Sequence, residues 1–294
     1  MNTFSISELS QYSGIKAHTI RIWEQRYNAL QPNRTEGNTR FYSNDQLRRL
    51  LNIVSLSDSD YKVSELCAMP DKQLFKLIDE LNNKEENKKE SYFISQLVSA
   101  GMTYDEAAFE KMFSYCLLSF GLKETYIKVL YPLLVRLGFL WVSDSIPPPH
   151  EHFISNLIKQ KLFTAIDSQP AANMQSDAWI LFLPENEFHE IGLLFANYIL
   201  KSNGKKTIYL GANLPLGSIE TLINNKSSNN ILLFFVHTSP PEEIKLYLTQ
   251  LNQDYPSQNI FVASDQKFTT ELGKIKMVKY LHSVEELDQQ LSKD

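Results

Sequence analysis

From Ala178 onward, short apolar runs alternate with longer segments of helical periodicity, and this alternation constrains the fold of the chain more than any other feature. Apolar runs that recur after each helical segment are typical of strands buried on both faces, which occur in parallel sheets covered by helices. We therefore predict a doubly wound parallel sheet of five strands in this region. The runs are Ala178–Leu183, Lys206–Leu210, Ile231–Val236, Asn259–Ala263 and Met277–Leu281.

The 294 residues exceed the usual size of one domain, and three zones of different composition follow one another. Short helical segments broken by turn signals fill the first zone, and the charged stretch Asn82–Glu90 follows it as a predicted linker or exposed helix. The next zone has helical periodicity and is interrupted by Pro147–Pro149. We predict three domains, over residues 1–80, 81–172 and 173–294.

Composition excludes several classes of protein. Cysteine occurs only at Cys67 and Cys116, which excludes a disulfide framework and a cysteine-based metal site and suits a reducing cytoplasm. No apolar stretch approaches the roughly 20 residues that a membrane span needs. Residues 1–25 include Glu8 and Glu24 and lack the apolar core of a signal peptide. We expect a cytoplasmic protein that does not enter a membrane.

Charge is distributed unevenly along the chain. The net charge is −5, but residues 1–50 carry seven basic and four acidic side chains, which makes this segment +3 and the remainder −8. A basic segment on an acidic body is typical of a protein in which one domain meets phosphates. The basic side chains are Lys16, Arg21, Arg26, Arg34, Arg40, Arg48 and Arg49.

The first 30 residues have the pattern of a helix-turn-helix. A short apolar-periodic helix ends at the turn Ser13-Gly14, and a second helix begins at Ala17. Two helices joined by such a turn place the second helix, the recognition helix, in the major groove of DNA. On that helix Ile20 and Trp23 would face the core. The side chains on its other faces, which can reach DNA, are His18, Thr19, Arg21 and Gln25.

A hairpin rich in turn residues follows over residues 33–42, and Arg34 and Arg40 would let it contact the DNA backbone or minor groove as a wing. The pair Trp23-Glu24, the proline Pro32 and the motif Arg40-Phe41-Tyr42-Ser43 resemble the DNA-binding domain of MerR-type regulators. This resemblance implies that Thr19, Arg21, Arg40 and Tyr42 contact DNA and that the protein binds a duplex operator as a dimer. Alternatively, Trp23 and Tyr42 are core aromatics, an interpretation that we adopt for Trp23, and the arginines form a solvated face.

The loop after the first predicted strand, residues 184–192, is a candidate ligand site. In open parallel sheets, ligands bind at the carboxyl ends of the strands near the switch point. Glu187 stands two residues before His189 and can accept its ring N–H, which would fix the tautomer and make the other nitrogen a better metal ligand. Gly192 would let a bulky ligand approach the next helix closely. Alternatively, His189 is an ordinary surface residue.

The pattern Glu187-x-His189-x-x-Gly192, with Gly204 and the segment Tyr209–Pro215 that contains Gly211, resembles the cobalamin-binding modules of the methionine synthase kind. The resemblance covers roughly residues 175–290. It implies that His189 is the lower cobalt ligand, that Glu187 orients it, and that Gly192 and Gly211 lie against the cofactor.

Two departures from that pattern concern the space for the cofactor. A hydroxyl-containing motif would fall at His237-Thr238-Ser239 and is displaced by Pro240-Pro241. The pair Ala263-Ser264 stands where a glycine pair is usual. The second change should crowd the slot for the cofactor's displaced base.

In the helical zone, nine residues separate Trp141 from the pair Glu151-His152. This pattern resembles the helical cap of the cobalamin-dependent photoreceptor repressors, the CarH group. It implies that Trp141 covers the upper face of adenosylcobalamin and that Glu151 and His152 line the adenosyl pocket. Alternatively, Trp141 is a bundle-core residue and His152 lies beside a helix cap. The group places a histidine after the tryptophan to take cobalt once light has removed the adenosyl group, but Val142 stands there, and His150 is the only nearby substitute.

The sequence thus predicts a multidomain chain: a winged helix-turn-helix, a four-helix bundle, and a flavodoxin-like (Rossmann-type) parallel five-stranded sheet. We expect a repressor that binds double-stranded DNA as a homo-oligomer, a dimer or tetramer, because two half-sites must be met at fixed spacing. Its oligomeric state and DNA affinity would respond to bound cobalamin, with light as a candidate signal. Alternatively, the last domain has lost cobalamin and senses another ligand or a protein partner. A corrinoid methyltransferase or isomerase subunit is disfavoured, because the chain has a DNA-binding domain and no further substrate domain.

Overall fold

The computed structural model describes residues 3–35, 37–57, 60–82, 86–142, 146–172, 178–225, 228–236, 240–264, 266–273, 275 and 277–292. The chain forms two compact units, Met1–Leu157 and Ile158–Asp294. The predicted motif His237-Thr238-Ser239 lies outside the described residues. Among the described residues, no helix is long and apolar enough to cross a membrane.

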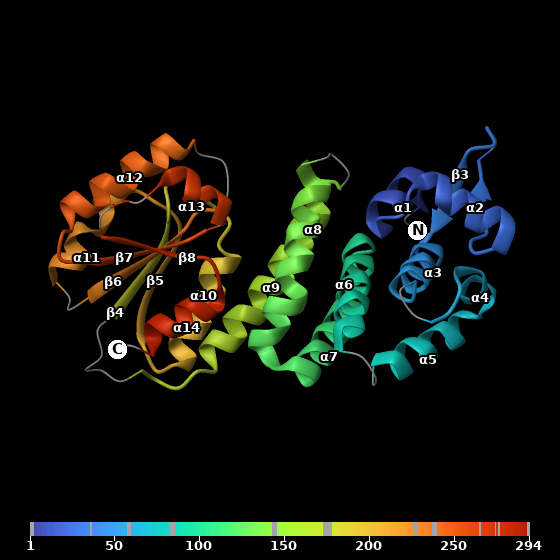
Figure 1. Cartoon of the computed structure of the whole chain (residues 1–294), viewed down its shortest axis with the longest axis horizontal. Coiled ribbons are helices and arrows are strands. Elements are labelled where there is room, and N and C mark those ends of the chain that lie inside the picture. Colours follow the sequence, from blue (N-terminus) through green and yellow to red (C-terminus); the bar gives the residue numbers. More distant parts are fainter. Residues whose placement is uncertain are drawn as a thin grey trace. The chain divides into compact units, whose positions relative to one another are not determined.

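The N-terminal part of the first unit is a small helical domain with a three-stranded antiparallel sheet (Figure 1). The sheet has the order β1-β3-β2, with Phe4 opposite Tyr42 and Arg34 opposite Arg40. Leu9, Ile20 and other apolar side chains fill the core. The elements are β1 (Thr3–Phe4), α1 (Ile6–Ser13), α2 (Ala17–Tyr27), β2 (Asn33–Arg34), β3 (Arg40–Ser43), α3 (Asn44–Ser55), α4 (Val63–Ala68) and α5 (Asp71–Asn82).

A helical region follows in the same unit, and two of its helices are joined to the N-terminal domain by hydrogen bonds. Gln96 on α6 donates its side-chain amide to the Asn52 side chain on α3 at 2.7 Å, and both residues are buried. The guanidinium of Arg136 on α8 donates to the carbonyl of Tyr12 on α1. The helices are α6 (Glu86–Met102), α7 (Glu106–Thr125), the π-helical turn η1 (Tyr126–Leu130), α8 (Tyr131–Val142) and α9 (Pro148–Asp167), the last of which continues into the second unit.

The second unit contains a parallel five-stranded sheet of order β5-β4-β6-β7-β8, covered by helices on both faces (Figure 1). The buried strand β4 is second in this order, between β5 and β6, so the switch point of the sheet falls beside it. The elements are β4 (Ala178–Pro184), α10 (Ile191–Ser202), β5 (Lys206–Leu214), η2 (Leu216–Ile219), α11 (Glu220–Asn225), β6 (Ser228–Phe234), α12 (Pro241–Asp254), β7 (Asn259–Ala263), α13 (Gln266–Leu272), β8 (Val278–Leu281) and α14 (Val284–Leu291).

All five predicted strands form, which confirms the fold class. Only β7 has the predicted bounds; β4 and β8 differ from them by one residue, and β5 and β6 by more. The strand β6 begins earlier than predicted, at Ser228, because polar residues extend its pairing: Asn230 lies opposite Asn259, and the Asn259 amide donates to the Asn230 side chain at 3.1 Å. The strand β5 continues past Leu210 because a bulge at Gly211, where φ is +82°, keeps it paired with β4. This extension carries the end of β5 toward the loop that follows β4.

Candidate functional site

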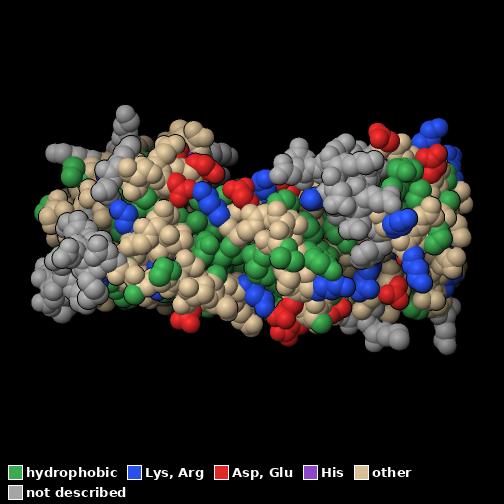
Figure 2. All heavy atoms as spheres, turned by 90° about the horizontal axis from the view of Figure 1, so that it is seen from below, with side chains coloured by type: hydrophobic (Ala, Val, Ile, Leu, Met, Phe, Trp, Pro, Cys, Tyr) green, Lys and Arg blue, Asp and Glu red, His purple; other side chains and the backbone are tan. Residues whose placement is uncertain are grey.

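The first candidate site is the exposed surface of α2 and the β2–β3 hairpin in the N-terminal domain. Ile20 and Trp23 are buried, which confirms their predicted place in the core. From the same helix, His18 and Arg21 are exposed and Thr19 is half-buried. Figure 2 shows basic side chains over the N-terminal domain, as the excess of charge in residues 1–50 predicts.

Hydrogen bonds within the β2–β3 hairpin stabilise it. Its turn is closed by backbone hydrogen bonds between Thr35 and Thr39, at 3.0 Å, and from Asn38 to Thr35, at 2.9 Å. The exposed guanidinium of Arg34 donates to the Asn38 side chain at 2.6 Å. Arg34 therefore stabilises the hairpin from within and still lies at its surface.

A half-buried carboxylate joins the hairpin to the recognition helix. Glu24 on α2 accepts one hydrogen bond from Arg40 Nε and another from the Tyr42 hydroxyl, both at 2.9 Å. The bond to Glu24 raises the pKa of the Arg40 guanidinium. The pKa of Tyr42 is raised mainly by burial and secondarily by the hydrogen bond to the Glu24 carboxylate and its charge. The three side chains hold α2 and β3 at a fixed separation, so we call Glu24, Arg40 and Tyr42 the wing clamp.

The wing clamp corrects one prediction. Tyr42 was expected to contact DNA, but its side chain is 0% exposed, and its hydroxyl is directed to Glu24. Tyrosine combines an apolar ring with a polar tip, so it can fill the core and still donate to a carboxylate at the edge of the core. Tyr42 therefore positions the wing and does not present a surface to DNA. Arg40 remains half-buried beside it.

Arg49 was counted among the basic side chains of residues 1–50, and the structure uses it internally. Its guanidinium donates to the carbonyls of Ala29 and Cys67, both at 2.7 Å, and of Met69, at 3.1 Å. It also forms an ion pair with Asp71. This arginine therefore joins α3 to the ends of α2, α4 and α5, and the charge that the domain can offer to phosphates is smaller than the sequence count suggests.

The second candidate site is the loop between β4 and α10, at the carboxyl end of β4. Glu187 is buried in this loop, with 8% of its surface exposed. Its Oε1 accepts from the backbone N–H groups of Phe188 and His189 at 3.0 Å, and its Oε2 accepts from the N–H of Val236, two residues after β6, at 3.2 Å. The carboxylate thus bridges the ends of β4 and β6 at the switch point of the sheet.

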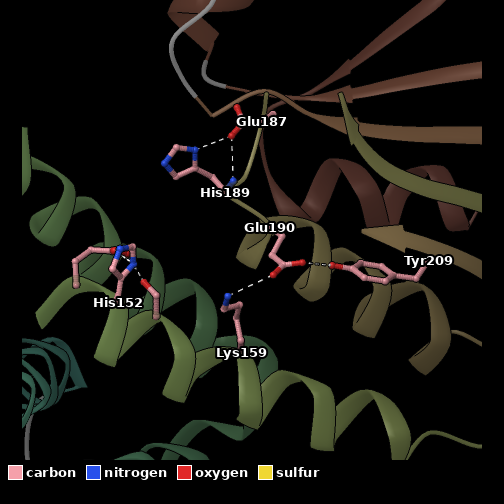
Figure 3. A network of polar contacts seen from close by, with 8 residues as sticks. His152, Lys159, Glu187, His189, Glu190 and Tyr209 are labelled. Atoms are coloured by element: carbon pink, nitrogen blue, oxygen red, sulfur yellow. Dashed lines mark hydrogen bonds and ion pairs between the residues drawn. The ribbon is translucent and has the colours of Figure 1, made fainter. Parts of the chain in front are cut away.

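The ring of His189 completes this arrangement (Figure 3). Its Nδ1 lies 2.6 Å from Glu187 Oε1. Burial alone would raise the pKa of Glu187, but the hydrogen bonds from the His189 ring and from backbone N–H groups outweigh it and lower this pKa to about 2. Because the carboxylate is ionised and can only accept, Nδ1 must carry the proton, and in the neutral ring Nε2 carries the lone pair. The His189 side chain is 58% exposed.

The end of β5 holds the loop from the other side. The N–H of Asn213 donates to the carbonyl of Glu187 at 3.1 Å, and the N–H of Asn186 donates to the Asn213 side chain at 2.9 Å. Both asparagines adopt left-handed backbone conformations, with φ of +57° and +66°, which asparagine tolerates better than most residues. Sequence reasoning missed Asn213, although it lies in the segment that carries the resemblance. Gly211 makes the preceding bulge possible.

The structure gives Gly192 a different role from the predicted one. A Cβ atom at this position would lie 2.9 Å from the ring of Phe234, at the end of β6. Glycine is therefore needed here for the close packing of α10 against the sheet, whether or not a ligand approaches. The role of Gly192 toward a ligand stays a prediction.

The predicted crowding residue Ser264 lies at the carboxyl end of β7. Its hydroxyl donates to the carbonyl of Phe235 at 2.9 Å, and its own carbonyl lies 3.3 Å from His282 Nδ1. The Phe235 ring packs edge-on against Tyr247 with ring centroids 6.2 Å apart. Ser264 therefore contacts both Phe235 and His282 at this part of the sheet edge.

The remaining predicted residues lie in the helical region. On α9, Glu151 accepts a hydrogen bond from Ser155, and its other oxygen lies 3.1 Å from Nδ1 of the exposed His152. Trp141 falls in the last turn of α8, and its side chain lies outside the described part of the structure. The ring of His150 stacks on Tyr104 at 4.5 Å, with Nδ1 3.2 Å from the tyrosine hydroxyl.

The donor set at His189 limits the kind of metal that it can hold. Among the described residues, no group of three or more His, Cys, Asp and Glu side chains could hold a metal ion. His189 offers one imidazole nitrogen, Nε2, a donor that suits a metal whose other ligands come with it, as in a macrocycle. The Glu187–His189 pair meets the requirement for an axial nitrogen ligand with an oriented ring.

Comparison with known proteins finds two family matches. Residues 4–69 match the MerR HTH family of regulatory proteins, and residues 94–165 match the B12-binding domain. The chain combines a MerR-type helix-turn-helix domain with a B12-binding domain. The second match covers the helical region, while the predicted lower ligand His189 lies beyond it.

The chain is homologous to two curated transcriptional repressors of Myxococcus xanthus. It is 24% identical to the HTH-type transcriptional repressor CarH over 258 residues, which cover 86% of each chain. It is 27% identical to the repressor CarA over 244 residues, which cover 82% of this chain and 79% of CarA.

The solved structure of the monomethylamine corrinoid protein of Methanosarcina barkeri has a similar fold. The TM-score is 0.52 at 16% sequence identity, and the match covers 66% of this chain and 95% of that protein. The predicted multidomain architecture is therefore confirmed.

Proposed function

We propose that the chain is a transcriptional repressor that binds duplex DNA through α2 and the β2–β3 wing, and cobalamin through His189. The observation that carries the proposal is the Glu187–His189 pair at the switch point, on a chain that also has a MerR-type domain. The contacts proposed for DNA come from His18, Thr19 and Arg21 on the recognition helix and from Arg34 and Arg40 on the wing.

For cobalamin, we propose that Nε2 of His189 is the lower axial ligand of cobalt. Glu187 would keep the ring in the required tautomer and orientation, because its carboxylate is held by three backbone N–H groups and the imidazole N–H. Bound adenosylcobalamin would supply a light-sensitive cobalt–carbon bond, chemistry that belongs to the cofactor. Trp141, Glu151, His152 and Gly211 remain candidates for contact with the same cofactor.

We propose that bound cobalamin changes the oligomeric state, and that the oligomer sets the affinity for DNA. Two DNA-binding domains must be presented at the spacing of two half-sites, so any change in subunit packing changes DNA affinity. The bonds of Gln96 to Asn52 and of Arg136 to Tyr12 support this, because they join the B12-binding helices to α3 and α1. A homo-oligomer, dimer or tetramer, is part of the proposal.

A second candidate function is supported by the contacts of Ser264. Its bond to Phe235 fills part of the sheet edge where the resemblance expects a glycine pair. In this alternative the α/β domain has lost cobalamin and senses another small ligand or a protein partner, while the DNA-binding domain keeps its role.

Retention of cobalamin separates the two candidates. The full chain, incubated with adenosylcobalamin in the dark and passed through a desalting column, should remain coloured. His189→Ala should abolish retention, and Glu187→Gln should weaken binding about 10–100-fold, because it disturbs the group that orients a metal ligand. A wild-type chain that emerges colourless would favour the second candidate, and unchanged retention in His189→Ala would refute His189 as the ligand.

A further inference from the structure

Glu190 follows His189 directly and is the N-cap residue of α10, just before the helix begins at Ile191. Its carboxylate makes no hydrogen bond to the helix that it precedes. Instead, Oε1 lies 3.4 Å from Lys159 Nζ on α9, and Oε2 accepts a hydrogen bond from the Tyr209 hydroxyl on β5 at 3.1 Å (Figure 3). The Glu190 side chain therefore connects α9 and β5, which are distant from each other in sequence, with the loop that bears His189.

The backbone of Glu190 is fixed on both sides. Its N–H donates to the carbonyl of Phe188 at 2.9 Å, which closes the turn around His189. Its carbonyl accepts from Leu194 at 2.9 Å in the first turn of α10. Both bonds fix the backbone of Glu190 relative to its neighbours. When Lys159 and Tyr209 hold the Glu190 side chain in place, they therefore also hold the position of His189.

Both partners of the Glu190 carboxylate are hydrogen-bond donors, and one of them carries a positive charge. Burial, with the nearby Glu190, raises the pKa of Tyr209, so its hydroxyl remains a donor. Lys159 supplies the opposite charge, and its side chain and that of Glu190 are 29% and 22% exposed. An ion pair with this much solvent contact adds little to the stability of a protein. The stability contributed by the ion pair therefore does not by itself account for three elements meeting at the residue next to His189.

We propose that Glu190 is a positioning residue for the His189 ligand, held in place by Lys159 and Tyr209. Glu190 does not touch the cofactor in this proposal. Through the backbone it would fix the position of the His189 ring, which Glu187 already orients. The proposal rests on the proposed binding of cobalamin by His189.

Paramagnetic resonance of cob(II)alamin bound to the full chain, labelled with ¹⁵N in histidine, tests the proposal. A coordinated ¹⁵N imidazole splits the cobalt signal into doublets, whereas the ¹⁴N of the cofactor's own base splits it into triplets. The wild type should give doublets. Glu190→Ala should lower the affinity for cobalamin about 10-fold or more and replace part of the doublet signal by triplets. Tyr209→Phe and Lys159→Met should each have a smaller effect in the same direction.

The matched control is Glu185→Ala, which removes an exposed carboxylate from the same loop and should behave as the wild type. Glu190→Ala with doublets and affinity equal to those of Glu185→Ala would overturn the positioning role and leave the proposed function intact. A wild type that binds cobalamin without doublets, or does not bind it, would overturn both. If Glu190→Ala fails to fold, Tyr209→Phe and Lys159→Met decide, and wild-type signals in both would refute the proposal.

Discussion

Replacing Tyr42 by phenylalanine removes only the hydroxyl that joins the wing to the recognition helix. That hydroxyl donates to the Glu24 carboxylate at 2.9 Å from a residue that is 0% exposed. A buried hydrogen bond to a charged group contributes about 1.5–3 kcal/mol, so Tyr42→Phe should lower the free energy of unfolding by about that amount. Urea unfolding of the full chain measures this loss. At a temperature where both proteins are folded, affinity for a duplex selected from a random library should stay within about threefold, or ~0.7 kcal/mol.

Arg21→Ala is the matched control, because Arg21 is exposed on the recognition helix. It should leave unfolding within about 0.5 kcal/mol of the wild type. It should weaken specific DNA binding by about 1–3 kcal/mol if Arg21 reads a base. If Tyr42→Phe instead behaves like Arg21→Ala, with unchanged stability and weakened DNA binding, Tyr42 contacts DNA directly and its role in the wing clamp is refuted.

Two further measurements test packing, one in the second unit and one in the first. Gly192→Ala should lower the free energy of unfolding by about 1–3 kcal/mol, because its Cβ would overlap the Phe234 ring, and a wild-type urea midpoint would show that the ring moves aside at no cost. Burial raises the pKa of Cys67 to about 11 and of Cys116 to about 12, so at about pH 8 both thiols should resist alkylation until the chain unfolds. Rapid labelling of either thiol in the folded chain, followed by mass spectrometry, would contradict its burial.

The parts that could be predicted from the sequence are those in which the signal is local. The strands of the second unit follow from apolar runs between helical segments, and the order in which they pair follows the usual doubly wound pattern. The Glu187–His189 pair could be predicted because both residues lie in one short loop, where a carboxylate two positions away can reach the ring. The helix-turn-helix likewise follows from neighbouring residues.

The parts that could not be predicted depend on contacts between distant segments. Lys159 and Tyr209 are 31 and 19 positions from Glu190, and no spacing rule joins them. The constraint on Gly192 comes from Phe234 on another strand. The burial of Tyr42 depends on which face of a four-residue strand meets the core, and a ring with a polar tip suits either face.

The central claim is that cobalamin bound at His189 controls DNA binding. Fluorescence anisotropy with the selected duplex, at fixed salt and in the dark, tests it most directly when the wild type and His189→Ala are titrated with and without adenosylcobalamin. We predict that cobalamin changes the DNA affinity of the wild type by about 5- to 150-fold, the range of a coupling free energy of 1–3 kcal/mol, and leaves that of His189→Ala unchanged. Equal wild-type affinities with and without cobalamin, or the same response in His189→Ala, would contradict the account.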